Sequence, residues 1–293
     1  MKKRPLTLIT CIILFLTIAI APVAAQRDSL AVVNGPWQTD TVNGLLLRQC
    51  QFSNKDCLGS NQFVCVLEIK PDDPYNLAFS YEPRRTPTSE HARRHNATAA
   101  INGSFFDMKE HHPICYLRID GKEVGENTPQ SVDPIHRKYY QYGSLALRRG
   151  RPIIFIPDSA RMAERSLPDR NIMTAGPLLV YHGKLMPMRT DKTFVTYRHN
   201  RTAIGVRRDG TVLLVTLDGR MKQSEGMSLQ DFQKLLRYLG CYDALNLDGG
   251  GSTTMYVKGY PHKGLVNHPT DNGRYDFEGE RGVSNCILVL PRK

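Results

Sequence analysis

The sequence predicts an α+β fold: a single domain with a mixed, mostly antiparallel β-sheet core and a few helices. Most apolar residues fall in short runs of about four to eight, bounded by Gly, Pro, Asn and Asp, which is typical of strands. Asp-Gly pairs at 120–121 and 209–210 separate such runs and predict β-hairpins. No repeat or low-complexity tract divides the 293 residues, and an apolar content of 41% suffices for one sizeable core.

The first 25 residues have the order of a secretory signal peptide. Lys2, Lys3 and Arg4 precede an apolar stretch from Leu6 to Ile20, and small residues end at Ala25, where cleavage is expected. A transmembrane anchor is the alternative, but the apolar stretch is shorter than the roughly 20 residues that span a bilayer. We therefore expect an exported protein, periplasmic or extracellular, that is not stably inserted in a membrane after cleavage.

Six cysteines follow the signal segment, and this even number permits disulfides in an exported protein. Cys50, Cys57 and Cys65 are close enough in sequence to staple the N-terminal part of the chain. Cys241 and Cys286 adjoin apolar residues and could equally be small core residues. No C-x-x-C pair occurs, which leaves little support for a zinc site.

The net charge favours an anionic partner. The formal charge is +11, and the signal segment holds three of the basic residues and no acidic residue, which leaves about +8 on the mature chain. Phosphates, acidic glycans and membrane surfaces all suit such a charge. Nucleic acid is not expected as a partner, because the basic residues are dispersed and no recognition-helix pattern occurs.

Residues 26–96 are expected to form lead-in strands that pack on the main domain. Within them, residues 27–61 predict an irregular segment with one strand at 45–47, and residues 63–69 predict a second strand. Thr86 and Pro87 offer a cap and a proline at the first helical position, which predicts a short polar helix to about Asn96.

The remaining residues, 97–293, predict mainly strands and one longer helix. Ser228 caps an amphipathic helix that Gly240 ends, because Leu229, Phe232 and Leu236 fall on one face. Residues 158–170 are expected to be an exposed connection. The predicted strands, in chain order, cover residues 99–102, 115–119, 144–148, 152–156, 178–181, 201–207, 211–217, 242–247, 255–257 and 286–290.

The loop Asp248-Gly249-Gly250-Gly251-Ser252 follows a short buried strand and predicts a functional site. Three consecutive glycines cost the folded state roughly 0.5–1 kcal/mol each relative to Ala, so an interaction must offset them. A tight turn without a ligand is the alternative. A carboxylate, open backbone N–H groups and hydroxyls crowd this turn, however, which favours a polyoxygenated or anionic ligand.

Four further strand ends carry polar residues in a comparable arrangement. They are Asn102-Gly103-Ser104-Phe105-Phe106-Asp107, Thr174-Ala175-Gly176-Pro177, Arg201-Thr202 and Asp218-Gly219-Arg220, to which Arg281 and Asn285 are added. Aromatic rings beside amides and carboxylates are typical of carbohydrate sites.

Taken together in this order, these motifs resemble the phosphodiester glycosidase family, many of whose bacterial members are exported. The likeness covers roughly residues 99–290, and the Asp-Gly-Gly-Gly-Ser-Thr loop is its most specific part. The resemblance implies that residues 97–293 form a catalytic domain that hydrolyses a sugar-1-phosphodiester, such as a GlcNAc-1-phosphodiester. Ser104 departs from the family, whose first loop usually reads Asn-Gly-Gly-Phe-Phe.

Hydrolysis of the C1–O bond passes through an oxocarbenium-like transition state, which a carboxylate stabilises. Asp248 is the expected catalytic carboxylate, acting as nucleophile or as base towards water, and Asp218 is the second choice. Arginines would hold the phosphate of the leaving group, which needs little protonation. The residues expected to contact or shape the substrate site are Asn102, Ser104, Phe106, Asp107, Thr174, Gly176, Arg201, Thr202, Arg220, Asn246, Gly249, Gly250, Gly251, Ser252, Arg281 and Asn285. The expected partner is a phosphorylated carbohydrate or a cell-envelope glycan.

Two other functions fit the same residues. In a metal-assisted phosphodiesterase, Asp107, Asp218 and Asp248 would hold Mg²⁺ or Ca²⁺, and water would attack phosphorus. In a non-catalytic module, the same loops would bind a cell-envelope glycan without turnover. The glycosidase function requires no cofactor or metal, although the sequence does not exclude a bound Mg²⁺ or Ca²⁺.

Overall fold

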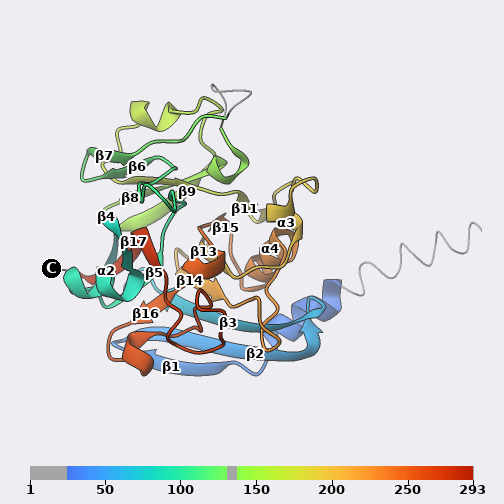
Figure 1. Cartoon of the computed structure of the whole chain (residues 1–293). Helices are drawn as coiled ribbons and strands as arrows, with labels where there is room; N and C mark the ends of the chain where they lie inside the picture. Colours follow the sequence, from blue (N-terminus) through green and yellow to red (C-terminus); the bar gives the residue numbers. More distant parts are fainter. Residues whose placement is uncertain (1–24, 131–136, 293) are drawn as a thin grey trace, which may run out of the picture.

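The computed structural model describes residues 25–130 and 137–292 and contains three β-sheets with few helices (Figure 1). The predicted signal peptide, apart from Ala25, lies outside the described residues. The strand orders are β1-β2-β3-β14-β13-β15-β11-β12, β7-β6-β10-β8-β9 and β16-β5-β17-β4. Each of these sheets is antiparallel throughout its described strands, so the predicted α+β class with mostly antiparallel strands is confirmed.

The eight-stranded sheet joins the N-terminal strands to the strands that carry the glycine loop. Its strands are β1 (Gln38–Val42), β2 (Leu45–Cys57), β3 (Ser60–Ile69), β14 (Val212–Leu217), β13 (Arg201–Val206), β15 (Asp243–Asn246), β11 (Leu178–Tyr181) and β12 (Lys184–Leu185). The Asp209-Gly210 turn joins β13 to β14, which confirms that predicted hairpin.

Residues 27–61 are regular rather than irregular, although the strand expected at 45–47 is confirmed as the start of β2. Residues 25–33 are helical, and β1 and β2 form a hairpin around Asn43 and Gly44, both of which have positive φ. Asn-Gly is a strong hairpin signal because both residues tolerate positive φ. Strand β3 then pairs with β14, so residues 26–96 contribute three strands, β1 to β3, at one side of the eight-stranded sheet.

The two smaller sheets pack around the same core. The four-stranded sheet holds β16 (Met255–Val257), β5 (Ala99–Asn102), β17 (Gly282–Pro291) and β4 (Tyr75–Pro87). The five-stranded sheet holds β7 (Lys122–Gly125), β6 (Leu117–Ile119), β10 (Ile172–Ala175), β8 (Gly143–Arg148) and β9 (Arg151–Phe155). One apolar cluster includes Leu245 of the eight-stranded sheet, Ile101 of the four-stranded sheet and Leu145 of the five-stranded sheet.

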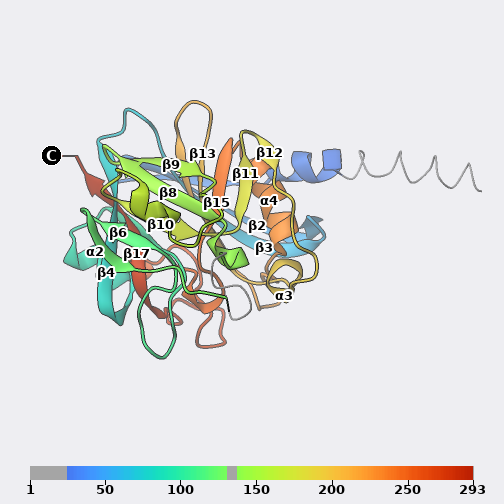
Figure 2. The same ribbon diagram turned by 90° about the horizontal axis from the view of Figure 1, so that it is seen from above.

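Helices cover the remaining sheet faces. Helix α4 (Leu229–Tyr238) packs on β11 through Leu235 and Leu236, beside the eight-stranded sheet (Figure 2). Ser228 caps it, since its Oγ accepts a hydrogen bond from the Asp231 N–H at 3.1 Å. The other named helices are α2 (Thr88–Arg94), α3 (Thr193–Thr196), η1 (Tyr139–Gln141), η2 (Ala163–Ser166), η3 (Gly250–Ser252) and η4 (His262–Gly264).

The six cysteines from Cys50 onward are all free and buried in the described part of the chain. Cys50 and Cys57 lie in the apolar cluster beneath helix α4, and Cys65 lies in the cluster between the sheets. The disulfide bond expected among Cys50, Cys57 and Cys65 is therefore not formed in this structure. No helix within the described ranges is long and apolar enough to cross a membrane.

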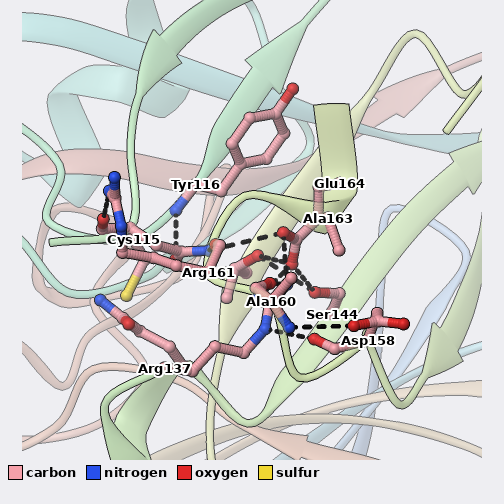
Figure 3. Close-up of polar contacts among 12 residues, drawn as sticks. Cys115, Tyr116, Arg137, Ser144, Asp158, Ala160, Arg161, Ala163 and Glu164 are labelled. Atoms are coloured by element: carbon pink, nitrogen blue, oxygen red, sulfur yellow. Dashed lines mark hydrogen bonds and ion pairs between the residues drawn. The ribbon is translucent and has the colours of Figure 1, made fainter. Parts of the chain in front are cut away.

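A buried ion pair joins Arg137, which precedes β8, to Glu164 of η2, which lies between β9 and β10 in the chain (Figure 3). The Arg137 guanidinium donates to both carboxylate oxygens of Glu164 at 2.7 Å, and both residues are at most 1% exposed. The hydroxyls of Ser144 and Thr174 donate to Glu164 Oε1 at 2.8 and 2.7 Å. The prediction that residues 158–170 are an exposed connection is therefore wrong at Glu164, whose burial is compensated by these four donors.

Arg137→Ala should lower the free energy of unfolding by about 3–5 kcal/mol, because it leaves the buried Glu164 carboxylate without its cation. Urea unfolding at pH 7 measures the loss. The matched control is Arg148→Ala, which removes a side chain that is 60% exposed from its pair with Asp169 and should cost far less stability, because solvent screens the pair. Equal losses in the two variants would contradict this assignment.

Candidate active site

The glycine loop lies where the eight-stranded and four-stranded sheets meet. Asp248 follows β15, and its backbone N–H donates to the carbonyl of Gly103, after β5, at 3.0 Å. The Asn102 side-chain amide, at the end of β5, donates to the Asp248 carbonyl at 2.7 Å. Two strand ends from different sheets are therefore joined by hydrogen bonds at the predicted site.

A pocket of about 240 Å³ opens beside this junction. It is lined by Phe105, Phe194, His199, Arg201, Arg220, Asp248, Gly249 and Gly250. Five of these residues are among the predicted site residues, and three were missed, namely Phe105, Phe194 and His199. Phe194 and His199 stand outside every motif, in a segment without strand periodicity, so no sequence signal marked them.

Each glycine of the loop has a neighbour that excludes a side chain. A Cβ on Gly249 would lie 2.6 Å from the Asn200 carbonyl oxygen, and one on Gly250 would lie 2.7 Å from Nη2 of Arg220. A Cβ on Gly251 would collide with the side chains of Asp271 and Arg281. Gly249 is therefore required by the neighbouring backbone and Gly250 by its φ of +61°, while a side chain at Gly250 or Gly251 would displace the charged groups that pack on the loop.

Burial raises the pKa of the Asp248 carboxyl to about 6. The Ser252 hydroxyl, the Gly249 N–H at 2.9 Å from Oδ1, and the charges of Arg281 and Arg220 act in the opposite direction. Asp248 therefore exchanges its proton close to neutral pH, which is typical of catalytic carboxyls.

Arg201 contributes a buried positive charge to the pocket. It is 2% exposed, and its Nε and Nη2 donate to the carbonyls of Met227, Phe194 and Tyr197 at 2.9–3.0 Å. Burial, with a contribution from Arg220, lowers its pKa to about 9, so it remains charged at neutral pH. Among the described residues Arg201 has no carboxylate partner within 4.0 Å, so its charge is available to an anion.

Arg220 contributes a second positive charge to the same pocket. Its φ of +66° is uncommon for a residue with a side chain and places the guanidinium against Gly250. It too makes no ion pair with a carboxylate in residues 25–130 or 137–292. Two arginines that repel each other in one pocket, neither of them in an ion pair with a carboxylate of the described residues, favour the binding of an anion such as phosphate.

Aromatic rings form another wall of the pocket. Phe105 lies 5.1 Å from Tyr140 and 5.9 Å from Phe194, measured between ring centroids. Phe106, which the sequence analysis expected at the substrate, is 7% exposed and packs in an apolar cluster with Ala92 and Tyr256. The ring that lines the pocket is therefore that of Phe105, and not that of Phe106 as expected.

Several predicted substrate ligands instead support the loop from behind. Asn102 Oδ1 accepts hydrogen bonds from the Thr202 hydroxyl at 2.8 Å and the Thr254 N–H at 3.2 Å. Asn285 Oδ1 accepts from the Ser104 N–H at 2.7 Å, while the Asn246 amide donates to the Gly176 carbonyl at 2.8 Å. These side chains are buried and do not line the pocket: Asn102 holds the loop at Asp248, whereas Asn246 and Asn285 hold the neighbouring Gly176 and Ser104.

Asp218, the second predicted catalytic carboxylate, is completely buried away from the pocket lining. Its oxygens accept hydrogen bonds from the Asn267 amide at 2.8 Å and the His268 N–H at 2.9 Å, and His268 Nδ1 lies 2.9 Å away. Burial raises the pKa of Asp218, and the contacts with His268 oppose this effect. Asp218 therefore anchors residues 267–268 rather than facing a substrate.

Three other predicted residues also have structural partners, and a fourth, Ser252, is buried in the loop. Asp107 Oδ1 accepts from the N–H groups of Lys109 and Glu110 at 2.7 Å, which makes it a turn residue. Arg281 pairs with Asp271, and Ser252 is buried next to Asp248. Thr174 belongs to the Glu164 network described above.

The arrangement of carboxylates also bears on a metal site. In the described ranges, no group of three or more His, Cys, Asp or Glu residues is placed to hold a metal ion. A metal-assisted phosphodiesterase would bring Asp107, Asp218 and Asp248 together. In the structure their carboxylates have separate hydrogen-bond partners: Asp107 in a turn, Asp218 in the core and Asp248 in the pocket.

Asp248→Asn should stabilise the protein above pH 7, by about 3 kcal/mol, because burial of the ionised carboxylate opposes folding. The raised pKa means that the folded state binds more protons than the unfolded state between about pH 4 and 6. The wild type therefore loses stability as pH rises through this window, and the advantage of the variant vanishes below it. Urea unfolding from pH 3.5 to 8 measures the difference; equal stability of both proteins at pH 8 would contradict it.

Comparisons with known proteins show which family shares the glycine loop and the strands around it. The model of the phosphodiester glycosidase family matches residues 95–290. YomE, an uncharacterized protein of the SPbeta prophage of Bacillus subtilis, is 45% identical over 201 residues, which are 65% of this chain and 29% of YomE. The human N-acetylglucosamine-1-phosphodiester alpha-N-acetylglucosaminidase is 25% identical over 221 residues, covering 70% of this chain and 40% of that enzyme. The chain thus spans less than half the length of either relative.

Solved structures share the fold. The zebrafish N-acetylglucosamine-1-phosphodiester alpha-N-acetylglucosaminidase catalytic domain, auto-inhibited by its pro-peptide, gives a TM-score of 0.63 at 19% identity and covers 88% of this chain and 84% of that chain. A hypothetical protein from Synechocystis gives 0.60 at 18% identity, covering 87% of this chain and 63% of that chain. Since the family match extends over well more than half of the chain and includes the loop that lines the pocket, this chain belongs to the phosphodiester glycosidase family.

Proposed function

We propose that the protein is an exported hydrolase that cleaves the glycosidic C1–O bond of a sugar-1-phosphodiester and releases the sugar and a phosphomonoester. The observation that carries this proposal is the pairing, in one pocket, of an ionisable Asp248 with Arg201 and Arg220, which lack carboxylate partners in the described part of the chain. A phosphodiester glycoside presents an anionic phosphate directly beside the reacting carbon. The two arginines can bind that phosphate while the Asp248 carboxylate lies in the same pocket to act on the carbon.

In this proposal the arginines bind the phosphate and Asp248 acts at C1. Positive charge develops at C1 as the bond to the phosphate oxygen breaks, and the Asp248 carboxylate stabilises that charge or attacks the carbon. The departing phosphate is weakly basic, so contact with two guanidinium groups suffices to stabilise it. Phe105 and Phe194 offer apolar ring surfaces for the C–H face of the sugar.

The names of the relatives suggest N-acetylglucosamine as the sugar. The mouse N-acetylglucosamine-1-phosphodiester alpha-N-acetylglucosaminidase is 37% identical over 97 residues, or 33% of this chain and 18% of that enzyme. The N-terminal order of basic, apolar and small residues supports export to the periplasm or the medium. The natural substrate is then a phosphorylated carbohydrate or a cell-envelope glycan.

The test is a hydrolysis assay of residues 26–293 on an α-GlcNAc-1-phosphodiester and on a p-nitrophenyl phosphodiester. Free GlcNAc should appear with the first substrate and persist in chelator, and Asp248→Asn should reduce its release at least about 10³-fold. Cleavage confined to the nitrophenyl compound, or abolished by chelator, would instead indicate a metal-assisted phosphodiesterase. Inactivity towards both compounds would favour a glycan-binding module.

Gly250→Ala should lower kcat/KM for the phosphodiester by about 10- to 100-fold, because the added Cβ displaces the Arg220 guanidinium. Gly259→Ala is the matched control. Gly259 also has positive φ, at +81°, but no atom lies within 4 Å of its Cβ position. Both variants should lose similar stability from backbone strain, about 1 kcal/mol, while only Gly250→Ala loses activity. Equal activity in both would show that the position of Arg220 does not matter.

A further inference from the structure

His199 lies in the pocket with its backbone fixed by its neighbours. The His199 N–H donates to the Met227 carbonyl at 3.3 Å, and the Met227 N–H donates to the His199 carbonyl at 3.1 Å. A Cβ on Gly219 would lie 2.8 Å from the His199 carbonyl carbon, and one on Gly226 would lie 2.6 Å from its oxygen. These contacts position the residue without using its imidazole ring.

The ring itself makes no hydrogen bond with the described part of the chain. Its Nδ1 is buried and lacks a partner, although the ring belongs to the lining of the pocket. A buried nitrogen without a partner costs free energy, so such a group is expected to meet a ligand or a water in the working enzyme. The charged groups around it are Arg201, Arg220 and Asp248.

The surroundings keep the imidazole neutral. Burial lowers the pKa of His199, and the positive charges of Arg201 and Arg220 lower it further. A neutral imidazole can accept a proton at neutral pH, whereas the two arginines cannot. In the proposed function the Asp248 carboxylate stabilises or attacks C1. His199 is therefore the pocket residue that remains free to accept a proton from water.

On the basis of the proposed function, we propose that His199 is the general base that accepts a proton from the water that attacks C1. The water oxygen forms a bond to C1 as the bond from C1 to its leaving oxygen breaks, and that oxygen keeps the electron pair. The water proton passes to the imidazole and then to solvent. Phosphate bound by Arg201 and Arg220 offsets their repulsion of the imidazolium, so proton transfer is easiest when substrate is bound.

The test compares His199→Ala and His199→Gln with the wild type on the α-GlcNAc-1-phosphodiester. Both variants should lose about 10²- to 10⁴-fold in kcat, with KM changed only a few-fold. Their melting temperatures should stay near that of the wild type, because the ring makes no hydrogen bond. Azide needs no base to act as a nucleophile, so it should restore turnover of His199→Ala and yield a glycosyl azide.

His268→Ala is the control, because His268 contacts the buried Asp218 and lies outside the pocket lining. It should lower the melting temperature, and azide should not restore any activity it loses. His199 variants that keep wild-type kcat, or that lose activity without rescue by azide, would overturn the role of His199 alone. An inactive wild type would overturn the proposed function, and this inference with it.

Discussion

The site depends on the hydrogen bonds that join the end of β5 to the residue after β15. Gly103 and Asn102 hold both backbone groups of Asp248, and the Asn102 Oδ1 is in turn held by Thr202 and Thr254. These bonds connect the four-stranded sheet to the eight-stranded sheet at the point where the chain turns into three glycines. A shift between the sheets would therefore move the Asp248 carboxyl directly.

The charges of the pocket are arranged for a ligand rather than for stability. Asp248 has a raised pKa, and two arginines repel each other nearby, which are unfavourable features for the protein alone. Backbone carbonyls compensate the buried Arg201, and the left-handed conformation of Arg220 turns its side chain onto the glycine loop. An anion between the arginines would relieve the repulsion, which is why the arrangement favours a phosphate-bearing substrate.

Local patterns in the sequence predicted the strands, the main hairpin and helix α4, because each depends on neighbours in the chain. Asp248 and the glycines that follow it could be identified as candidate site residues for the same reason, because they form one continuous motif. Burial and direction could not be predicted, as Phe105 and Phe106 show: adjacent residues in extended chain point to opposite sides, and only the packing decides which side is the pocket. Likewise, the sequence predicted Asn102 as a substrate ligand. An Asn that instead holds a loop by hydrogen bonds occupies the same position at the end of a strand, so the sequence alone does not distinguish the two roles.

The measurement that tests the account most directly is hydrolysis of the α-GlcNAc-1-phosphodiester in ¹⁸O-labelled water, followed by mass spectrometry of both products. Attack at C1, which the proposed function predicts, places the label in the released sugar and leaves the phosphomonoester unlabelled. Label in the phosphomonoester would show attack at phosphorus and would contradict the assignment of Asp248 to the sugar carbon.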